Sequence, residues 1–236
     1  MSLAAAERAL RRSAALMLVA LALLAGVFVR ALAFTPPDAI QGPAQKIFYV
    51  HAPSAWVALL SFVIVGVCSV LYLALREQRI DRLAASCAEV GVVFITGALV
   101  TGPIWGKTIW GAWWTWDARL TSTLFIWFIF FGYLVMRSAV HEPGQRARFS
   151  AVLGILGALL VPFIHVSVVW FRTLHPQPVV LKPEGPTLPG SMLATLLASF
   201  FVFTLLFVAL VWQRYAQAEV ADARAARQAD ADDRAR

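Results

Sequence analysis

The chain has 236 residues, of which 60% are hydrophobic and 14% are charged. This balance excludes a soluble globular domain and predicts an integral membrane protein that lies in the lipid bilayer. The formal net charge of +7 does not indicate nucleic-acid binding, because the basic residues are spread over short loops between apolar segments.

Six apolar segments are each long enough to cross about 30 Å of hydrocarbon as a helix. In chain order they are Ser13–Phe34, Pro53–Leu75, Leu83–Ile104, Leu120–Met136, Phe149–Phe171 and Gly190–Trp212. We interpret the first as a retained helix, because no small-residue cleavage pattern follows it. The sequence predicts an all-α polytopic membrane protein with six transmembrane helices in a domain over residues 1–213. Residues 214–236 are mostly Ala, Arg and Asp, which predicts a disordered or loosely helical tail.

The distribution of lysine and arginine predicts the orientation in the membrane. Fourteen of the 20 lie at the two termini or in the second-to-third and fourth-to-fifth loops, and six lie on the other side. The positive-inside rule then places both termini, and with them the tail, in the cytoplasm. The outward segments are Thr35–Ala52, Trp105–Arg119 and Arg172–Pro189, and we expect the function to reside there.

Tryptophans are concentrated in the second outward segment. Five of the nine fall within twelve residues: Trp105, Trp110, Trp113, Trp114 and Trp116. An aromatic belt is the alternative interpretation, but a belt distributes isolated rings over both membrane faces. If the segment is an interfacial helix, Trp110, Trp113 and Trp114 align on one face, and Asp117 extends that face. Such a shelf suits a large planar ligand such as a porphyrin.

Two of the four histidines lie at the outward ends of predicted spans. His51 comes at the start of the second span, and we place it just outside the helix. His175 precedes a proline beyond the end of the fifth span. Together with the tryptophans they predict a pair of axial haem ligands, although each alone is also typical of an interfacial histidine. His165 lies deeper in the fifth span and ranks third as a ligand, whereas His141 lies in an inner turn.

Haem carries two propionates, which need cationic partners, and Arg119 and Arg172 are our candidates on the outward side. Asp117 directly precedes the fourth span, where it either caps the helix or contacts the ligand; the sequence leaves both open. Glu89, in the inner half of the third span, either reaches the interface or pairs with a loop arginine.

The stretch from Trp105 to Thr121 reads W-G-x-x-x-W-G-x-W-W-x-W-D-x-R-L-T. With the six-span layout and the stretches Tyr49–Pro53 and Thr173–His175, it resembles the haem-handling family that bears the tryptophan-rich WWD signature. Within that family the chain is similar to the cytochrome c maturation proteins of the CcmC, or haem exporter protein C, type. The resemblance covers most of the chain. Relatives of the haem lyase type have many more spans, so the length argues against them.

The resemblance implies that His51 and His175 ligate the haem iron and that Trp105–Asp117 forms the haem platform. It also implies that haem b is bound transiently at the periplasmic face of the bacterial inner membrane. From there it would pass to the membrane-anchored haem chaperone CcmE, which binds it covalently through a histidine. The ABC-type complex CcmAB, with the small membrane protein CcmD, would then release the loaded chaperone. These partners rest on the resemblance alone.

Two other functions stay open on the sequence. A solute permease would need ionisable or broken-helix features near the bilayer midplane, which are scarce apart from His165 and Pro162. A redox protein resembling a cytochrome b would need its histidines within the spans, whereas His51 and His175 lie at the ends. We do not expect an enzyme, since catalysis of the usual kind is not visible in the sequence. We do not expect thiol chemistry either, since both cysteines fall inside predicted spans.

Overall fold

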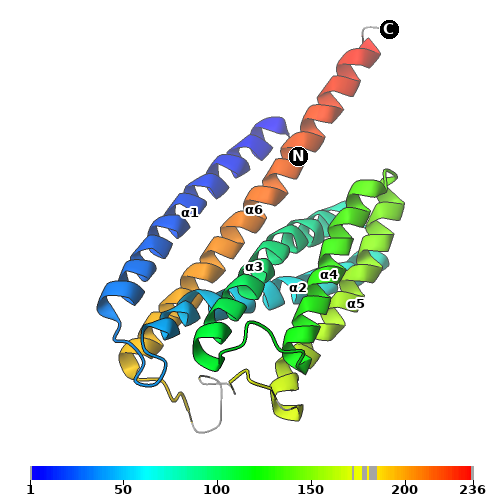
Figure 1. Cartoon of the computed structure of the whole chain (residues 1–236). Coiled ribbons are helices and arrows are strands. Elements are labelled where there is room, and N and C mark those ends of the chain that lie inside the picture. The colour runs from blue at the N-terminus through cyan, green and yellow to red at the C-terminus, as the bar shows by residue number, and fades with distance from the viewer. Residues whose placement is uncertain (1, 172, 177–179, 181–184, 235–236) are drawn as a thin grey trace.

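The computed structural model describes residues 2–171, 173–176, 180 and 185–234, which form six long helices (Figure 1). They are α1 (Leu3–Val29), α2 (Phe48–Leu75), α3 (Gln78–Trp110), α4 (Ala118–Ala139), α5 (Pro143–Trp170) and α6 (Gly190–Arg234). Each contains a window apolar enough to cross a membrane, which confirms the predicted all-α, six-span fold. Between α1 and α2 lie a π-helical turn, Arg30–Phe34, and a 3-10 turn, Pro43–Ile47.

Two helices extend beyond their predicted spans toward the outward segments. Helix α2 begins at Phe48, because the 3-10 turn Pro43–Ile47 leads directly into it. His51 therefore lies in the first turn of α2, and its predicted position just outside the helix was wrong. Helix α3 continues to Trp110 and ends at Gly111, whose φ of 74° is the left-handed conformation that glycine adopts without strain.

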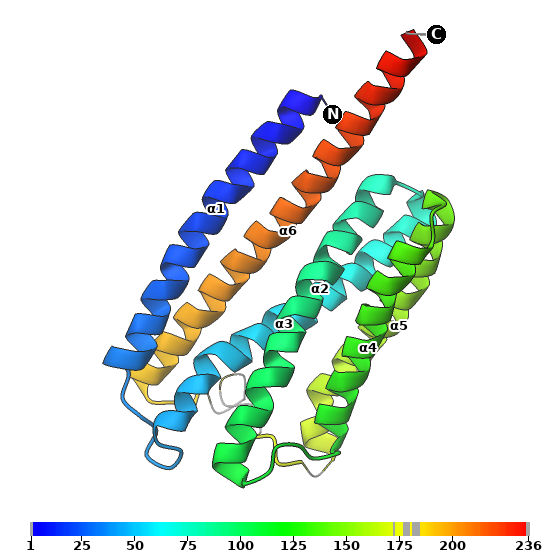
Figure 2. The same cartoon turned by 45° about the horizontal axis from the view of Figure 1, so that its top comes forward.

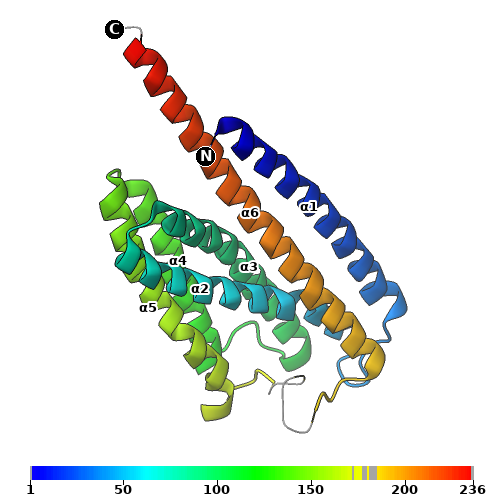
Figure 3. The ribbon, with the colours of Figure 1, turned by 180° about the vertical axis from the view of Figure 1, so that it is seen from behind.

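Helices α2 to α5 pack together as a bundle (Figure 2). Helix α6 lies against α2 and α3, and α1 packs on the far side of α6, as the view from behind also shows (Figure 3). Gly66 of α2 lets α5 approach closely, since a Cβ added there would lie 2.4 Å from the Cβ of Ala158. In the centre of the bundle, the rings of Phe62 and Phe130 stack with their centroids 3.8 Å apart.

The two ends of the molecule differ (Figure 1). Both termini and the two tight turns, α2–α3 and α4–α5, lie at one end, which we call the terminal end. The three longer connections, α1–α2, α3–α4 and α5–α6, lie at the other end, which we call the loop end. This arrangement separates the basic flanks from the outward segments in the way that the predicted topology requires.

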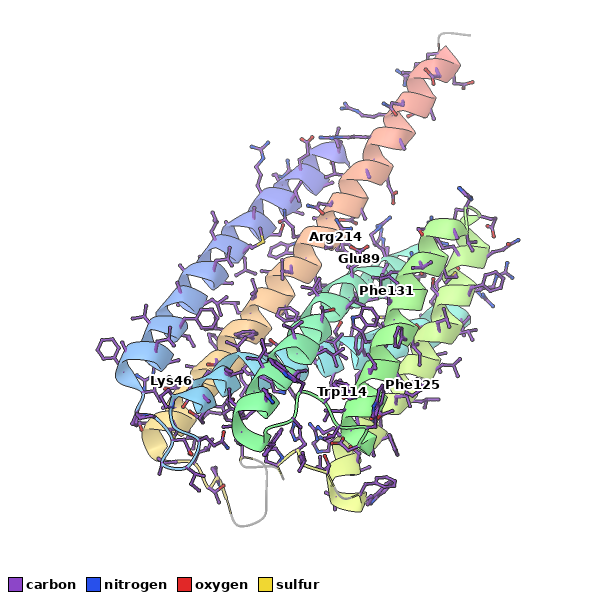
Figure 4. The ribbon with its side chains drawn as sticks, viewed as in Figure 1. Lys46, Glu89, Trp114, Phe125, Phe131 and Arg214 are labelled. Carbon is purple, nitrogen blue, oxygen red and sulfur yellow. The ribbon has the colours of Figure 1, made fainter. Side chains whose placement is uncertain are left out.

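Helix α6 projects beyond the bundle at the terminal end and is helical to Arg234, through most of the tail for which we predicted disorder or loose helix. Ion pairs hold this part of α6 to α3. Arg82 lies 3.5 Å from Glu219, and Glu89 pairs with Arg214 (Figure 4). The partner of Glu89 is thus an arginine of α6 rather than of a loop.

Candidate functional site

A cavity of about 300 Å³ opens at the loop end of the bundle. Helices α2 to α6 contribute to its wall, and the connections α3–α4 and α5–α6 each add residues to it. Figure 4 shows Trp114 on the first of these connections, beside the end of α4. Of the residues that the sequence singled out, the cavity is lined by His51, Trp105, Trp114, Arg119, His165 and His175.

His51 reaches the cavity from the first turn of α2. Its Nδ1 lies 3.0 Å from Oγ1 of Thr101 on α3, and the Thr101 hydroxyl donates to the Gly97 carbonyl at 2.8 Å. Because the hydroxyl hydrogen is used there, its oxygen accepts from Nδ1–H of His51 and leaves Nε2 with a free lone pair. Gly102 provides space for the ring, since a Cβ there would lie 3.1 Å from His51 Cε1.

His175 reaches the cavity from the α5–α6 connection, beyond the end of α5 at Trp170. Its Nδ1 lies 3.1 Å from the carbonyl oxygen of Pro176. A carbonyl can only accept, so Nδ1 carries the proton and Nε2 is free here as well. Burial, and after it the positive charge of Arg119, lowers the pKa of His175 to about 4. The imidazole is therefore neutral at pH 7, which is the form that binds a metal.

The two imidazoles lie next to each other, with ring centroids 6.5 Å apart and planes inclined by 41°. A metal bound about 2 Å from one nitrogen of each ring fits between imidazoles at this spacing. The ring of Trp105 lies edge-on to His51, with centroids 5.8 Å apart. Two imidazoles with free Nε2 atoms, beside an aromatic wall, are a donor set that fits haem iron.

The five tryptophans divide into two groups. Trp105 is 7% exposed and donates its indole N–H to Gln41 at 3.0 Å, and with Trp114 it lines the cavity. Trp113 and Trp116 are 59% and 77% exposed, and Trp110 is also exposed. These three rings form the outer surface of the segment instead of the cavity wall.

The predicted alignment of Trp110, Trp113, Trp114 and Asp117 on one helical face was wrong. Helix α3 ends at Trp110 because Gly111 turns the backbone into the left-handed region. Residues 111–117 then run as an irregular connection, which we call the tryptophan loop. Because the helix ends at this boundary, the i, i+3, i+4 spacing does not align these residues on one face. Trp114 lines the cavity, whereas Trp110 and Trp113 are exposed.

Asp117 is the N-cap of α4, the first of its two predicted alternatives. Its Oδ1 accepts from the backbone N–H groups of Arg119 at 3.0 Å and Leu120 at 2.9 Å. Its Oδ2 accepts from the hydroxyls of Thr115 at 2.9 Å and Thr173 at 2.8 Å. The carboxylate thus joins the tryptophan loop to the connection that carries His175.

Arg119 is the predicted propionate partner that lines the cavity. In the part of the chain that the structure describes, no carboxylate lies within ion-pair distance of its guanidinium. Lys46 and Lys107, at the same end, each donate to a backbone carbonyl. Of these three cations, Arg119 is therefore the most available partner for a propionate. Arg172, the second predicted propionate partner, lies outside the described residues.

Sequence reasoning missed several residues of the site. Phe48 packs on Trp105 with centroids 5.6 Å apart, and Thr101 contacts the His51 ring. Thr173, named above only within the stretch Thr173–His175, accepts the backbone N–H of His175. The available signal for Thr101 was its polarity inside an apolar span, which is a hint of function in a membrane protein. His141, predicted to lie away from the site, is exposed in the α4–α5 turn at the terminal end.

The sequence matches the family model for Heme exporter protein C (CcmC) over residues 2–231. The Heme exporter protein C of Bradyrhizobium diazoefficiens is 39% identical over 185 residues, covering 78% of this chain and 70% of that protein. The protein of the same name from Haemophilus influenzae is 36% identical over 195 residues, covering 83% and 79%. That of Escherichia coli K12 is 34% identical over 181 residues, covering 77% and 73%. On these matches, the chain belongs to the heme exporter protein C (CcmC) family.

Proposed function

We propose that the chain binds haem at the outer face of the bacterial inner membrane and delivers it to a membrane-anchored haem chaperone during c-type cytochrome maturation. The observation that carries this proposal is the pair His51 and His175, whose imidazoles lie 6.5 Å apart at the cavity lined by Trp105, Trp114 and Arg119. Membership of the heme exporter protein C family supports a role in haem handling for cytochrome c maturation.

Each of these groups has a role in holding haem b as a transient cargo. The free Nε2 atoms of His51 and His175 bind the iron axially. Trp105 and Trp114 pack against the macrocycle, because aromatic rings stabilise a flat apolar ligand. The guanidinium of Arg119 binds a propionate. No bond within the cargo is made or broken in this role, so the chain acts as a carrier rather than an enzyme.

The difference between the two ends of the bundle supports a proposed orientation and a proposed surface for a recipient. The loop end is poor in basic residues, and the positive-inside rule supports its facing the periplasm. The exposed rings of Trp110, Trp113 and Trp116 lie beside the cavity and offer an apolar surface to a recipient. We propose that this recipient is CcmE, and that CcmAB with CcmD acts on the loaded chaperone.

The visible spectrum of the purified protein tests this proposal. Protein extracted in detergent from haem-replete cells that also express the partners should carry haem with two axial nitrogen ligands. His51→Ala and His175→Ala should each lose haem or show a spectrum with one axial ligand fewer. His141→Ala is the matched control, because this histidine is exposed at the opposite end of the molecule.

Three outcomes would contradict parts of the proposal. Wild-type protein without haem would refute haem binding and favour a solute permease. A spectrum that changes in His165→Ala, but not in His51→Ala or His175→Ala, would favour a cytochrome b-like protein with ligands inside the spans. Delivery is measured separately, as covalent haem on the co-expressed chaperone, and unchanged loading in both variants would exclude these histidines from it.

A further inference from the structure

His51 and His175 are held in different ways. His51 is fixed by the backbone of α2 and by Thr101, as described above. His175 has no helix to fix it, because α5 ends at Trp170 and α6 begins at Gly190. The position of the His175 imidazole therefore depends on contacts of the connection that carries it, which include the bond from Nδ1 to the Pro176 carbonyl.

One chain of hydrogen bonds supplies a further contact. The Thr173 hydroxyl donates to Asp117 Oδ2 at 2.8 Å. With its hydrogen used in this way, the same oxygen accepts the backbone N–H of His175 at 3.1 Å. These two hydrogen bonds connect the Asp117 carboxylate, through the Thr173 hydroxyl, to the backbone of His175, the proposed ligand.

The carboxylate of Asp117 has no free acceptor position left to bind the cargo. An ionised carboxylate offers about four acceptor positions. Oδ1 uses two on the backbone N–H groups of Arg119 and Leu120, and Oδ2 uses two on the hydroxyls of Thr115 and Thr173. Asp117 is also absent from the cavity wall among the described lining residues. Asp117 therefore forms its hydrogen bonds with other groups of the protein and not with a ligand.

We propose that Asp117 and Thr173 are positioning residues for His175. The rigid start of α4 anchors Asp117, Asp117 holds Thr173, and Thr173 fixes the backbone at which the His175 side chain turns toward His51. The tryptophan loop and residues 173–176 are thereby held together, so that Trp114 and His175 keep their relative placement. This inference rests on the proposed function, since it concerns a ligand of the proposed cargo.

The test compares four variants with wild type and His175→Ala, all purified in detergent with their haem. Thr173→Val removes the hydroxyl at nearly constant volume, and Thr173→Ser restores it. Asp117→Asn keeps an oxygen for the α4 cap but replaces the second oxygen with an amide that cannot accept. Thr115→Val removes the other hydroxyl partner of Asp117 without touching the connection that carries His175, and is the matched control.

We expect Thr173→Val and Asp117→Asn to retain roughly tenfold less haem than wild type, since each loses a hydrogen bond to or from a carboxylate. Their remaining haem should show the spectrum of His175→Ala, and added imidazole should restore the two-ligand spectrum in all three. Thr173→Ser and Thr115→Val should match wild type. Imidazole rescue distinguishes a displaced ligand from general misfolding, because a collapsed site would not recover.

The inference and the proposed function fail in different ways. If His175→Ala changes the spectrum while Thr173→Val and Asp117→Asn keep wild-type spectra and haem content, the positioning role is overturned and haem ligation stands. The same holds if Thr115→Val alters the spectrum as strongly as Thr173→Val. If wild type carries no haem, the proposed function itself fails. If His175→Ala has the same haem content and spectrum as haem-loaded wild type, the assignment of His175 as a ligand fails, and the positioning role fails with it.

Discussion

Thr101 shows how a single hydroxyl can set the chemistry of a neighbouring histidine. Its hydrogen goes to the Gly97 carbonyl within α3, and its oxygen faces Nδ1 of His51. Metal-binding histidines commonly donate their second ring N–H to such an acceptor, which fixes both the tautomer and the ring orientation. Thr101 therefore does for His51 what the Pro176 carbonyl does for His175.

We predict that Thr101→Val lowers haem retention roughly tenfold, because the acceptor that orients His51 is lost. Thr101→Ser should retain haem as wild type does, since it keeps the hydroxyl. Haem content per protein and the visible spectrum are the measurements. Thr96→Val is the control: Thr96 also bonds to a carbonyl of its own helix, but its other partner is Trp127, away from the cavity wall. Equal haem in Thr101→Val and Thr96→Val would contradict the role.

The sequence predicted His51 and His175 as a pair at the ends of two spans, and the structure brings their rings together, but the threonines that contact them were not predicted. The histidines were recognisable because topology alone brings the ends of spans to one membrane face. Thr101 lies 50 positions from His51 and Thr173 lies 56 positions from Asp117, and such pairings depend on how helices pack. Side-chain hydrogen bonds over these separations leave no periodic pattern in a single sequence.

At the scale of helices, a charged cluster joins α3, α4 and α5 at the terminal end. The guanidinium of Arg137 lies 2.7 Å and 2.9 Å from the two oxygens of Asp81, and 3.1 Å from the Ser150 hydroxyl. Asp81 is only 6% exposed. Such a two-pronged pair is geometrically specific, and neither charge can lose its partner without a desolvation cost.

We predict that Asp81→Ala lowers the free energy of unfolding by about 3 kcal/mol, because Arg137 keeps its charge without a partner. Adding Arg137→Leu to Asp81→Ala should recover much of the loss, since no unpaired charge remains. Unfolding in mixed micelles measures both. The haem spectrum should stay wild type, because the cluster lies at the end opposite the cavity. A double variant less stable than the single one would contradict this explanation.

Hydropathy predicted the number and order of the helices because it depends on composition within the hydrocarbon. It could not predict where helices end in polar surroundings, so α2 begins earlier than Pro53 and α3 reaches Trp110. The tryptophan segment was misinterpreted for this reason. Its residues have the spacing of a helical face, but the left-handed backbone at Gly111 ends the helix before Trp113, Trp114 and Asp117 are reached.

At the scale of the whole molecule, the separation of the two ends makes the orientation testable. Ile40, in the α1–α2 connection, is 95% exposed at the loop end, and His141 is exposed at the terminal end. The positive-inside rule predicts that the loop end faces the periplasm. The two native cysteines, Cys68 and Cys87, are buried and provide a low background for thiol labelling.

We predict that a membrane-impermeant thiol reagent added to intact spheroplasts labels Ile40→Cys and leaves His141→Cys unlabelled. Both variants should react after the membrane is opened, which controls for accessibility. The unsubstituted chain should stay unlabelled in both conditions. Labelling of His141→Cys alone in intact spheroplasts would invert the orientation and move the cavity to the cytoplasm.

The pairing of α1 with α6 ties the first helix of the chain to the last. Ser13 lies 2.6 Å from Gln213 near one end of the pair, and Arg30, directly after α1, lies 3.0 Å from Thr195 near the other. During synthesis α1 enters the bilayer first and waits for its partner until the ribosome has made all the others. A chain that ends before α6 leaves α1 without the helix that it packs against. These two helices therefore come together only after every span between them has been made.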